Sequence, residues 1–288
     1  MSVLPQTEER LSTEEAVAQS RREHKSVWRT LRSYIQNWGA ALVIALSGLV
    51  LWEISVRVFE VQEWLLPPIS QILRELFADP ALFLKNAWVT LREILVGFAV
   101  STTFGFVMAT GMFWSRLLER SVYPFLIASQ TIPVFTLAPL LVIWTGTGMT
   151  PKVVIVVLFT FFPITIGLMT GLRSVDADMI AMFRTLGASK WQMFTKLHLP
   201  SALPYLFAGL KVAAVVSVIG AVIGEWIGAS SGLGWLIKTS GSRYQTDKVF
   251  AAIITLSVMA SLMFILISQV QSRMLWNYHQ SDSEGESN

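Results

Sequence analysis

Six apolar stretches of about 20 residues, separated by polar segments, set the pattern of this sequence. They cover residues 38–58, 88–113, 123–145, 152–172, 203–227 and 249–270. A helix of that length crosses the hydrocarbon core of a bilayer, so the pattern predicts an all-α, polytopic membrane protein with a six-span domain over 38–272. Between the first two spans, residues 63–85 contain a double-proline break. Helical periodicity then runs from Ile69 to Phe77, which predicts a short helix at the outer interface.

The two ends of the chain differ from the spans. Residues 1–37 hold a capping-box pattern, Ser12 with Glu15, followed by apolar residues at helical spacing beside Arg and Lys. We expect a cytoplasmic arm whose amphipathic helix lies on the membrane surface; a solvated helical arm is the alternative. The polar and acidic stretch 273–288 predicts a disordered cytoplasmic tail.

The composition agrees with a chain that lies in lipid. Of 288 residues, 53% are apolar and 14% are charged, and none is cysteine. Soluble proteins devote about a quarter of their residues to charge, so a soluble enzyme and a disordered chain are both disfavoured. The lack of cysteine argues against a disulfide scaffold and a thiolate zinc site. Six tryptophans fall at or next to predicted span ends, as in an aromatic belt: Trp38, Trp88, Trp114, Trp144, Trp226 and Trp276.

The distribution of basic residues predicts the orientation. Six spans put both termini on one side, together with the long segment 173–202. That side collects 13 of the 22 Lys and Arg residues, against 8 on the other side, while Lys211 lies inside a span. Since basic residues concentrate in the cytoplasm, we expect both termini and the 173–202 loop to be cytoplasmic.

Two predicted spans carry small residues at every fourth position. The rows are Gly97, Ser101, Gly105 and Ala109 in the second span, and Gly209, Ala213, Ser217 and Ala221 in the fifth. Small residues at this spacing let helices approach closely, so the rows predict tight helix seams. Bundle packing alone explains them without a transport role.

Two features inside the spans are candidates for a solute pathway. Glu225 continues the small-residue row of the fifth span, so it faces a helix seam, either as a functional ionisable group or as a satisfied interhelical contact. Pro133 should break hydrogen bonding in the third span. Polar residues surround it and serve either a solute path or helix packing: Ser129, Gln130, Thr131 and Thr136.

Motifs for catalysis and cofactor binding are not found in the sequence. It has no Gly-x-x-x-x-Gly-Lys phosphate loop, no Gly-x-Ser-x-Gly elbow, and its three histidines lack metal-ligand spacing. The turn Ser230-Ser231-Gly232-Leu233-Gly234 follows no strand and is interpreted as a loop. We therefore expect a non-catalytic protein without a cofactor of its own.

The segment 173–202 predicts two short helices on the cytoplasmic side. Asp176 precedes an apolar face of Ile180, Phe183 and Leu186, and Gly187 is suited to end that helix. Ser189 can cap a second helix, with Trp191, Phe194 and Leu197 at three-residue steps, before Pro200 and Pro204 stop it and restart the next span. Apolar residues on both helices indicate a docking element.

At this point the sequence resembles the permease subunits of binding-protein-dependent ABC importers, whose inner loop carries Glu-Ala-Ala, three residues, Gly, nine residues and Ile-x-Leu-Pro. Here Gly187 is followed after nine residues by Leu197-His198-Leu199-Pro200, whereas Ala181-Met182-Phe183 stands in place of Glu-Ala-Ala. The contact of that Glu is therefore not carried over. Further segments resemble the nitrate, sulfonate, taurine and bicarbonate branch, which includes riboflavin and thiamine-pyrimidine permeases: Ala138-Pro139-Leu140, Trp144-x-Gly146-x-Gly148, Phe161-Phe162-Pro163 and Gly232-Leu233-Gly234.

The resemblance implies a six-helix type I ABC importer domain in a prokaryotic inner membrane. Two permease copies, as a homodimer, would form the pathway, an extracytoplasmic solute-binding protein would deliver substrate, and no nucleic acid is involved. Cytoplasmic ATPase subunits would bind ATP and dock on the 173–202 loop. The resemblance assigns this coupling role to Asp176, Ile180, Phe183, Leu186, Gly187, Ala188, Trp191, Leu197, Leu199 and Pro200.

The substrate is the least determined feature. Only Lys211 lies well inside a predicted span, whereas aromatic and hydroxyl residues are more plentiful in the outer half. This favours a neutral or heterocyclic nutrient, such as a vitamin or its precursor, over nitrate, taurine, a sulfonate or bicarbonate. A secondary transporter or channel and a membrane-embedded enzyme are the alternatives from other classes. The former would need ion-coupling charges at mid-membrane, and the latter a catalytic constellation.

Overall fold

A computed structural model describes the backbone of residues 39–285 and the side chains of residues 39–275. The arm predicted over 1–37 and the last three residues lie outside the described residues. The described chain divides into two compact units, one made of residues 39–62 with 66–70 and the other of residues 63–65 with 71–285. Each unit is described in turn.

The first unit contains the helix Gly39–Val58, which matches the first predicted span. Most of its aliphatic side chains are exposed, as on a helix that faces lipid. Its charged residues form hydrogen bonds with other residues of the same unit. The Oε1 atom of Glu53 accepts hydrogen bonds from Arg57 Nε and the Ser70 hydroxyl, each at 2.8 Å. Trp52 Nε1 donates to the carbonyl oxygen of Pro67 at 3.2 Å, which holds the proline break against this helix.

The second unit is helical throughout its regular elements. Helix α2 (Ile69–Ala78), which begins in the first unit, is the short helix predicted after the prolines. The following elements are α3 (Pro80–Trp114), α4 (Arg116–Ser129), α5 (Val134–Thr145), α6 (Met149–Arg173), α7 (Ala177–Thr185), α8 (Lys190–Met193), the π-helical turn η1 (Phe194–His198), α9 (Leu199–Gly228), α10 (Leu233–Gly241) and α11 (Thr246–Gly285). Residues 273–285, where a disordered tail was expected, continue α11 as helix.

Five helices of the described chain are long and apolar enough to cross a membrane. They are Gly39–Val58, Pro80–Trp114, Met149–Arg173, Lys190–Gly228 and Thr246–Leu275. The span predicted over 123–145, with a break at Pro133, corresponds to part of α4 and to α5, which meet at an angle of 100°. Counting this bent pair as one span gives six. Pro133 caps α5 with φ −64° and ψ 102°, an extended conformation that interrupts the helix at the predicted break.

Two helix boundaries also differ from the sequence prediction. Helix α3 begins at Pro80 instead of residue 88, because the Asp79 side chain accepts a hydrogen bond from Leu82 N at 3.1 Å and proline is suited to the first helical turn. At the other boundary, Pro200 does not end the helix as predicted. The helical path continues from Lys190 to Gly228, since Pro200 falls in the first turn of α9.

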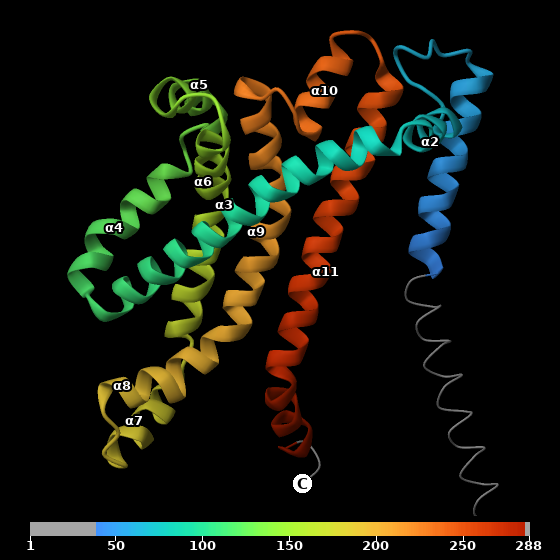
Figure 1. Cartoon of the computed structure of the whole chain (residues 1–288). Coiled ribbons are helices and arrows are strands. Elements are labelled where there is room, and N and C mark those ends of the chain that lie inside the picture. The colour runs from blue at the N-terminus through green and yellow to red at the C-terminus, as the bar shows by residue number, and fades with distance from the viewer. Residues whose placement is uncertain (1–38, 286–288) are drawn as a thin grey trace, which may run out of the picture. The chain divides into compact units, whose positions relative to one another are not determined.

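Helix α6 lies between α3 and α9, and both predicted small-residue rows face it. A Cβ atom at Gly97 of α3 would lie 2.5 Å from Cγ1 of Val156, and one at Gly209 of α9 would clash with the carbonyl oxygen of Pro163 in α6. Ser101, Ala109, Ala213, Ser217 and Ala221 are completely buried. The predicted tight seams are therefore confirmed, and they make α6 the centre of the second unit (Figure 1).

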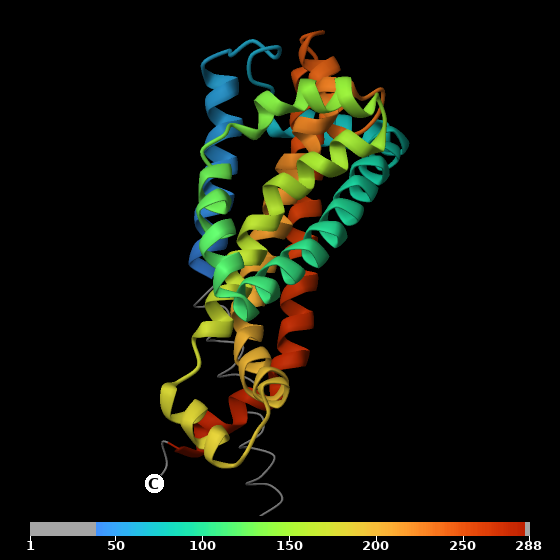
Figure 2. The ribbon, with the colours of Figure 1, turned by 90° about the vertical axis from the view of Figure 1, so that its left-hand side faces the viewer.

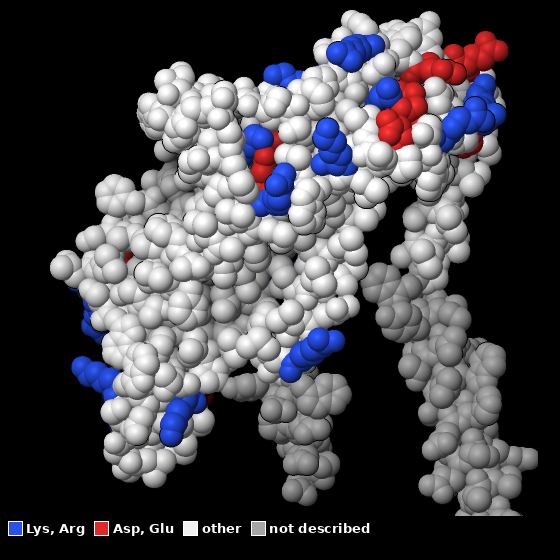
Figure 3. Space-filling model, viewed as in Figure 1, with Lys and Arg blue, Asp and Glu red and all other residues white. Residues whose placement is uncertain are grey.

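The two ends of the second unit are formed by different helices. Helices α7 and α8 lie at the same end as the C-terminal part of α11, and α5 and α10 lie at the opposite end in both views (Figures 1 and 2). On the face of this unit drawn in Figure 3, charged side chains gather toward the two ends, with an uncharged belt between them. That distribution is the one expected of a bundle whose middle lies in hydrocarbon.

Candidate coupling and translocation sites

Local hydrogen bonds shape the loop between α6 and α9 as the sequence predicts. Asp176 caps α7 by accepting a hydrogen bond from Asp178 N at 2.9 Å. Gly187 follows with φ +73°, a left-handed conformation that favours glycine. Ser189 and Gln192 then form a complete capping box at the start of α8. The two short helices are thus separated by a turn whose left-handed backbone suits glycine and strains most other residues.

The predicted coupling residues divide into an outer and an inner group. Helices α7 and α8 contain no buried residue, and Leu186 and Trp191 are 76% and 64% exposed. Ile180, Phe183 and Ala188 are half-buried. Leu197 is buried in the bundle and the adjoining Leu199 and Pro200 are half-buried, so this part of the motif belongs to the bundle and not to the free surface.

An aromatic cluster attaches the loop to the bundle. The ring of Phe113, near the end of α3, lies 5.7 Å from that of Phe194 and 4.9 Å from that of His198. The Trp191 ring packs against those of Trp114 and Phe194. Nδ1 of His198 also lies 2.8 Å from the carbonyl oxygen of Leu172 in α6. These contacts therefore attach the loop to the ends of α3 and α6.

The polar residues of the broken span lie at the bend between α4 and α5. Their hydroxyl groups donate to nearby carbonyl oxygens: Ser129 to Leu126, Thr131 to Ala128 and Thr136 to Pro133, each at 2.7 Å. Gln130, Thr131, Pro133 and Thr136 are exposed, and Ser129 is half-buried. The bend thus presents several polar groups on a surface that the bundle does not cover.

Glu225 lies apart from these residues, in a buried polar cluster. Its side chain is completely buried. One carboxylate oxygen accepts the hydroxyl proton of Thr90 at 2.6 Å, and the other accepts backbone N–H groups of Gly234 at 2.5 Å and Trp235 at 3.3 Å. The geometry fits the satisfied interhelical contact, which was one of the two interpretations of this residue.

The turn before α10 is also held by helix α3. Gly232 N donates to Oδ1 of Asn86 at 2.8 Å, and Leu233 N donates to the Thr90 hydroxyl at 2.9 Å. These donors are the N–H groups that the start of a helix leaves without intrahelical partners. The interpretation of Ser230–Gly234 as a plain loop therefore misses its role, because this turn binds α10 to α3 and α9.

A buried ion pair adjoins the cluster. Nζ of Lys152 in α6 lies 2.5 Å from Oε1 of Glu93 in α3, and both side chains are more than nine-tenths buried. The sequence pattern did not single out this pair. The only signal of this pair in the sequence is that two charged residues of opposite sign fall within or at the end of apolar stretches.

Comparison with known proteins identifies the family. The model of the family described as binding-protein-dependent transport system inner membrane component matches residues 101–276. The chain belongs to this family. It is the permease of an ABC importer, and importers of this kind work with an ATPase and a solute-binding protein.

Several relatives resemble the permease over most of its length. The formylaminopyrimidine transport permease ThiX of Halalkalibacterium halodurans is 41% identical over 81% of this chain and 93% of its own. The riboflavin transport permease RibX of Chloroflexus aurantiacus is 31% identical over 81% and 87%. Among solved structures, a chain of the MetNI methionine ABC transporter matches with a TM-score of 0.55 and 22% identity, covering 65% of this permease and 96% of that chain. This last likeness shows that the fold is shared.

Proposed function

We propose that this permease forms the import pathway for a pyrimidine precursor of thiamine or a closely related neutral heterocycle. The observation that carries the proposal is the 41% identity to the formylaminopyrimidine permease over 234 residues. The charges of the bundle support it. The Lys152 ammonium group is paired with Glu93, and Lys211 lies over the ring of Phe264 at 5.6 Å. An oxyanion in this interior would compete with partners that both lysines already have.

The same machinery for nitrate, taurine, a sulfonate or bicarbonate is the second candidate, since the aliphatic sulfonate permease SsuC of Bacillus subtilis is 27% identical over 83% of this chain. Proteoliposomes that contain the permease with its ATPase and binding protein would be loaded with ATP and given labelled substrates one at a time. Uptake of formylaminopyrimidine in excess of taurine and nitrate is the expected result. Preferential uptake of an oxyanion would refute the substrate assignment.

We further propose that α7 and its flanking residues dock on the ATPase. The loop exposes apolar side chains, among them Leu186 and Trp191, at an end of the bundle where an aqueous surface would otherwise solvate them. In this arrangement the permease is non-catalytic, its partner hydrolyses ATP, and both termini are cytoplasmic with the loop. Closure of the ATPase would move the loop and, through the contacts of Trp191 with Phe194 and of Phe113 with Phe194 and His198, rock the bundle as a rigid body.

We assign the pathway to the bend between α4 and α5. Ser129, Gln130, Thr131, Pro133 and Thr136 provide polar groups within an otherwise apolar span. A second copy of the chain, in a homodimer, would place two such bends around a common axis. In this proposal Glu225 serves the pathway indirectly, by fixing α10 and the end of α9 beside it.

A further inference from the structure

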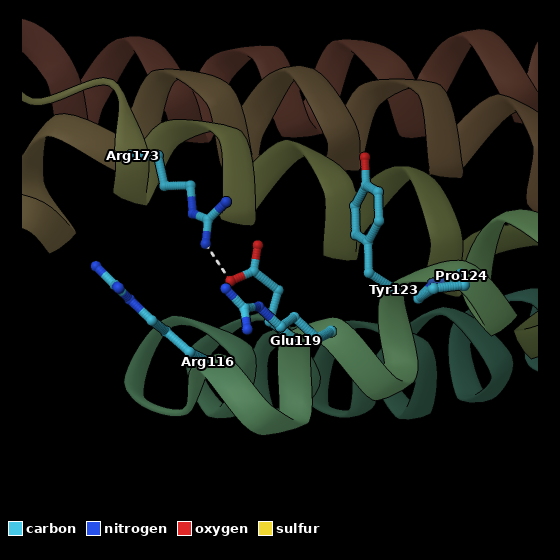
Figure 4. A pocket seen from close by; sticks show the side chains of 6 residues that line it. Arg116, Glu119, Tyr123, Pro124 and Arg173 are labelled. Carbon is cyan, nitrogen blue, oxygen red and sulfur yellow. Dashed lines mark hydrogen bonds and ion pairs between the residues drawn. The ribbon is translucent and has the colours of Figure 1, made fainter.

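A basic cavity lies beside the N-terminal half of α4. It has a volume of about 540 Å³ and is lined by Arg116, Glu119, Arg120, Tyr123 and Pro124 of α4 and by Arg173 at the end of α6 (Figure 4). The cavity follows the end of α3 at Trp114 and coincides with the end of α6 at Arg173, both of which are membrane-spanning helices. It therefore lies at a boundary between hydrocarbon and water, at the end that carries α7 and α8.

The charges of the cavity are unbalanced. Arg173 is paired with Glu119, and their side chains point toward each other in Figure 4. Among the described side chains, no carboxylate forms an ion pair with Arg116 or Arg120. Two guanidinium groups thus remain for an anion. The start of α4, where the Ser115 hydroxyl accepts a hydrogen bond from Leu118 N, adds the positive end of a helix dipole.

The opposite part of the cavity is apolar. Tyr123 and Pro124 line it about two helical turns beyond Arg116. On the same helix, Leu117 and Phe125 are 78% and 76% exposed, as side chains that contact acyl chains would be. A charged mouth that continues into an exposed apolar surface matches a molecule with an anionic head and hydrocarbon tails.

We propose that this cavity binds the phosphate headgroup of an anionic phospholipid. Arg116 and Arg120 contact the phosphate, since a guanidinium group can donate two hydrogen bonds to it. The Arg173–Glu119 pair closes the inner wall, and the glycerol and acyl chains pass along Tyr123 and Pro124 to the apolar side of α4. Because α4 leads directly into the bend at Pro133, the bound lipid stabilises the position of the broken span.

The test measures lipid binding by the full chain, independently of any transported substrate. Purified permease would be titrated with phosphatidylglycerol or phosphatidylcholine, and bound lipid would be counted by native mass spectrometry. The double variant Arg116→Gln/Arg120→Gln should bind phosphatidylglycerol about tenfold or more weakly, and phosphatidylcholine without change. Arg273→Gln is the matched control, since Arg273 is an exposed basic residue near the end of α11 that does not line the cavity.

Other outcomes would overturn the proposal. If inorganic phosphate displaces phosphatidylglycerol at equal concentration, the site takes a free anion instead of a lipid. If the double variant keeps lipid binding but loses co-purifying ATPase or self-association, the arginines serve a protein contact. Should the double variant fail to fold, Arg116→Lys/Arg120→Lys keeps the charge but loses the planar donor fork, and must still bind more weakly than the unmodified chain. Unchanged affinity would refute the assignment.

Discussion

Nζ of Lys152 lies 2.5 Å from Oε1 of Glu93 in the interior of the bundle, and both side chains are more than nine-tenths buried. The second carboxylate oxygen of Glu93 has no hydrogen-bond partner among the described residues. Breaking a buried pair by removing one partner costs about 3–5 kcal/mol, because the remaining charge is left without compensation. The pair therefore ties α3 to α6 in a way that small-residue packing alone does not.

The first prediction concerns that pair. Lys152→Met should lower the apparent melting temperature of the purified permease strongly, and Lys152→Met/Glu93→Gln should recover much of the loss. The control is Lys248→Met, since Lys248 and Glu75 are 3.6 Å apart and partly exposed. Exposed pairs contribute at most about 1 kcal/mol. An equal decrease in melting temperature for Lys152→Met and Lys248→Met would show that the buried pair contributes no more stability than the exposed one.

The second prediction concerns the attachment of α10. Glu225→Ala removes the acceptor of the Thr90 hydroxyl and of two backbone N–H groups, and a buried unsatisfied group costs about 1–3 kcal/mol. Hydrogen exchange should therefore accelerate over residues 229–241, while the centre of α6 remains protected as an internal control. If residues 229–241 exchange as slowly as in the unmodified chain, the carboxylate does not hold this turn.

The third prediction separates backbone conformation from bulk at Gly187. Nothing lies within 4 Å of a Cβ atom built there, so a substitution acts through the φ angle of +73° or through a partner. Asparagine adopts this conformation readily and a β-branched residue does not. Gly187→Val should uncouple ATP hydrolysis from transport in the reconstituted importer, whereas Gly187→Asn should retain both. Equal loss in the two variants would instead indicate a tight contact of residue 187 with the ATPase.

The fourth prediction uses the absence of cysteine from the sequence. Thr131→Cys and Thr136→Cys should react with a membrane-impermeant thiol reagent, because both positions are exposed at the bend assigned to the pathway. Leu262→Cys, an exposed position on α11 that we expect to face lipid, should not react. Reaction should fall when transported substrate is present. Labelling of Leu262→Cys at the same rate would contradict the assignment of the bend.

Local features of the fold could be predicted from the sequence because they depend on residues close together along the chain. Spans follow from the length of an apolar run, and the Asp176, Gly187 and Ser189 caps follow from hydrogen bonds that reach no further than five residues. The small-residue rows were readable for the same reason, since a fixed four-residue spacing places them on one helix face. The family motif, from Gly187 to Pro200, is likewise confined to a short stretch of sequence.

Only the tertiary structure determines which residues form the polar cluster around Glu225 and the adjoining ion pair. Lys152 meets Glu93 across 59 positions of sequence, and Gly232 meets Asn86 across 146. Such partners depend on the relative register and rotation of α3, α6 and α9, which the periodicity of each helix leaves undetermined. The 100° bend between α4 and α5 is a similar case, because Pro133 dictates an interruption but the direction of the following helix depends on what it packs against.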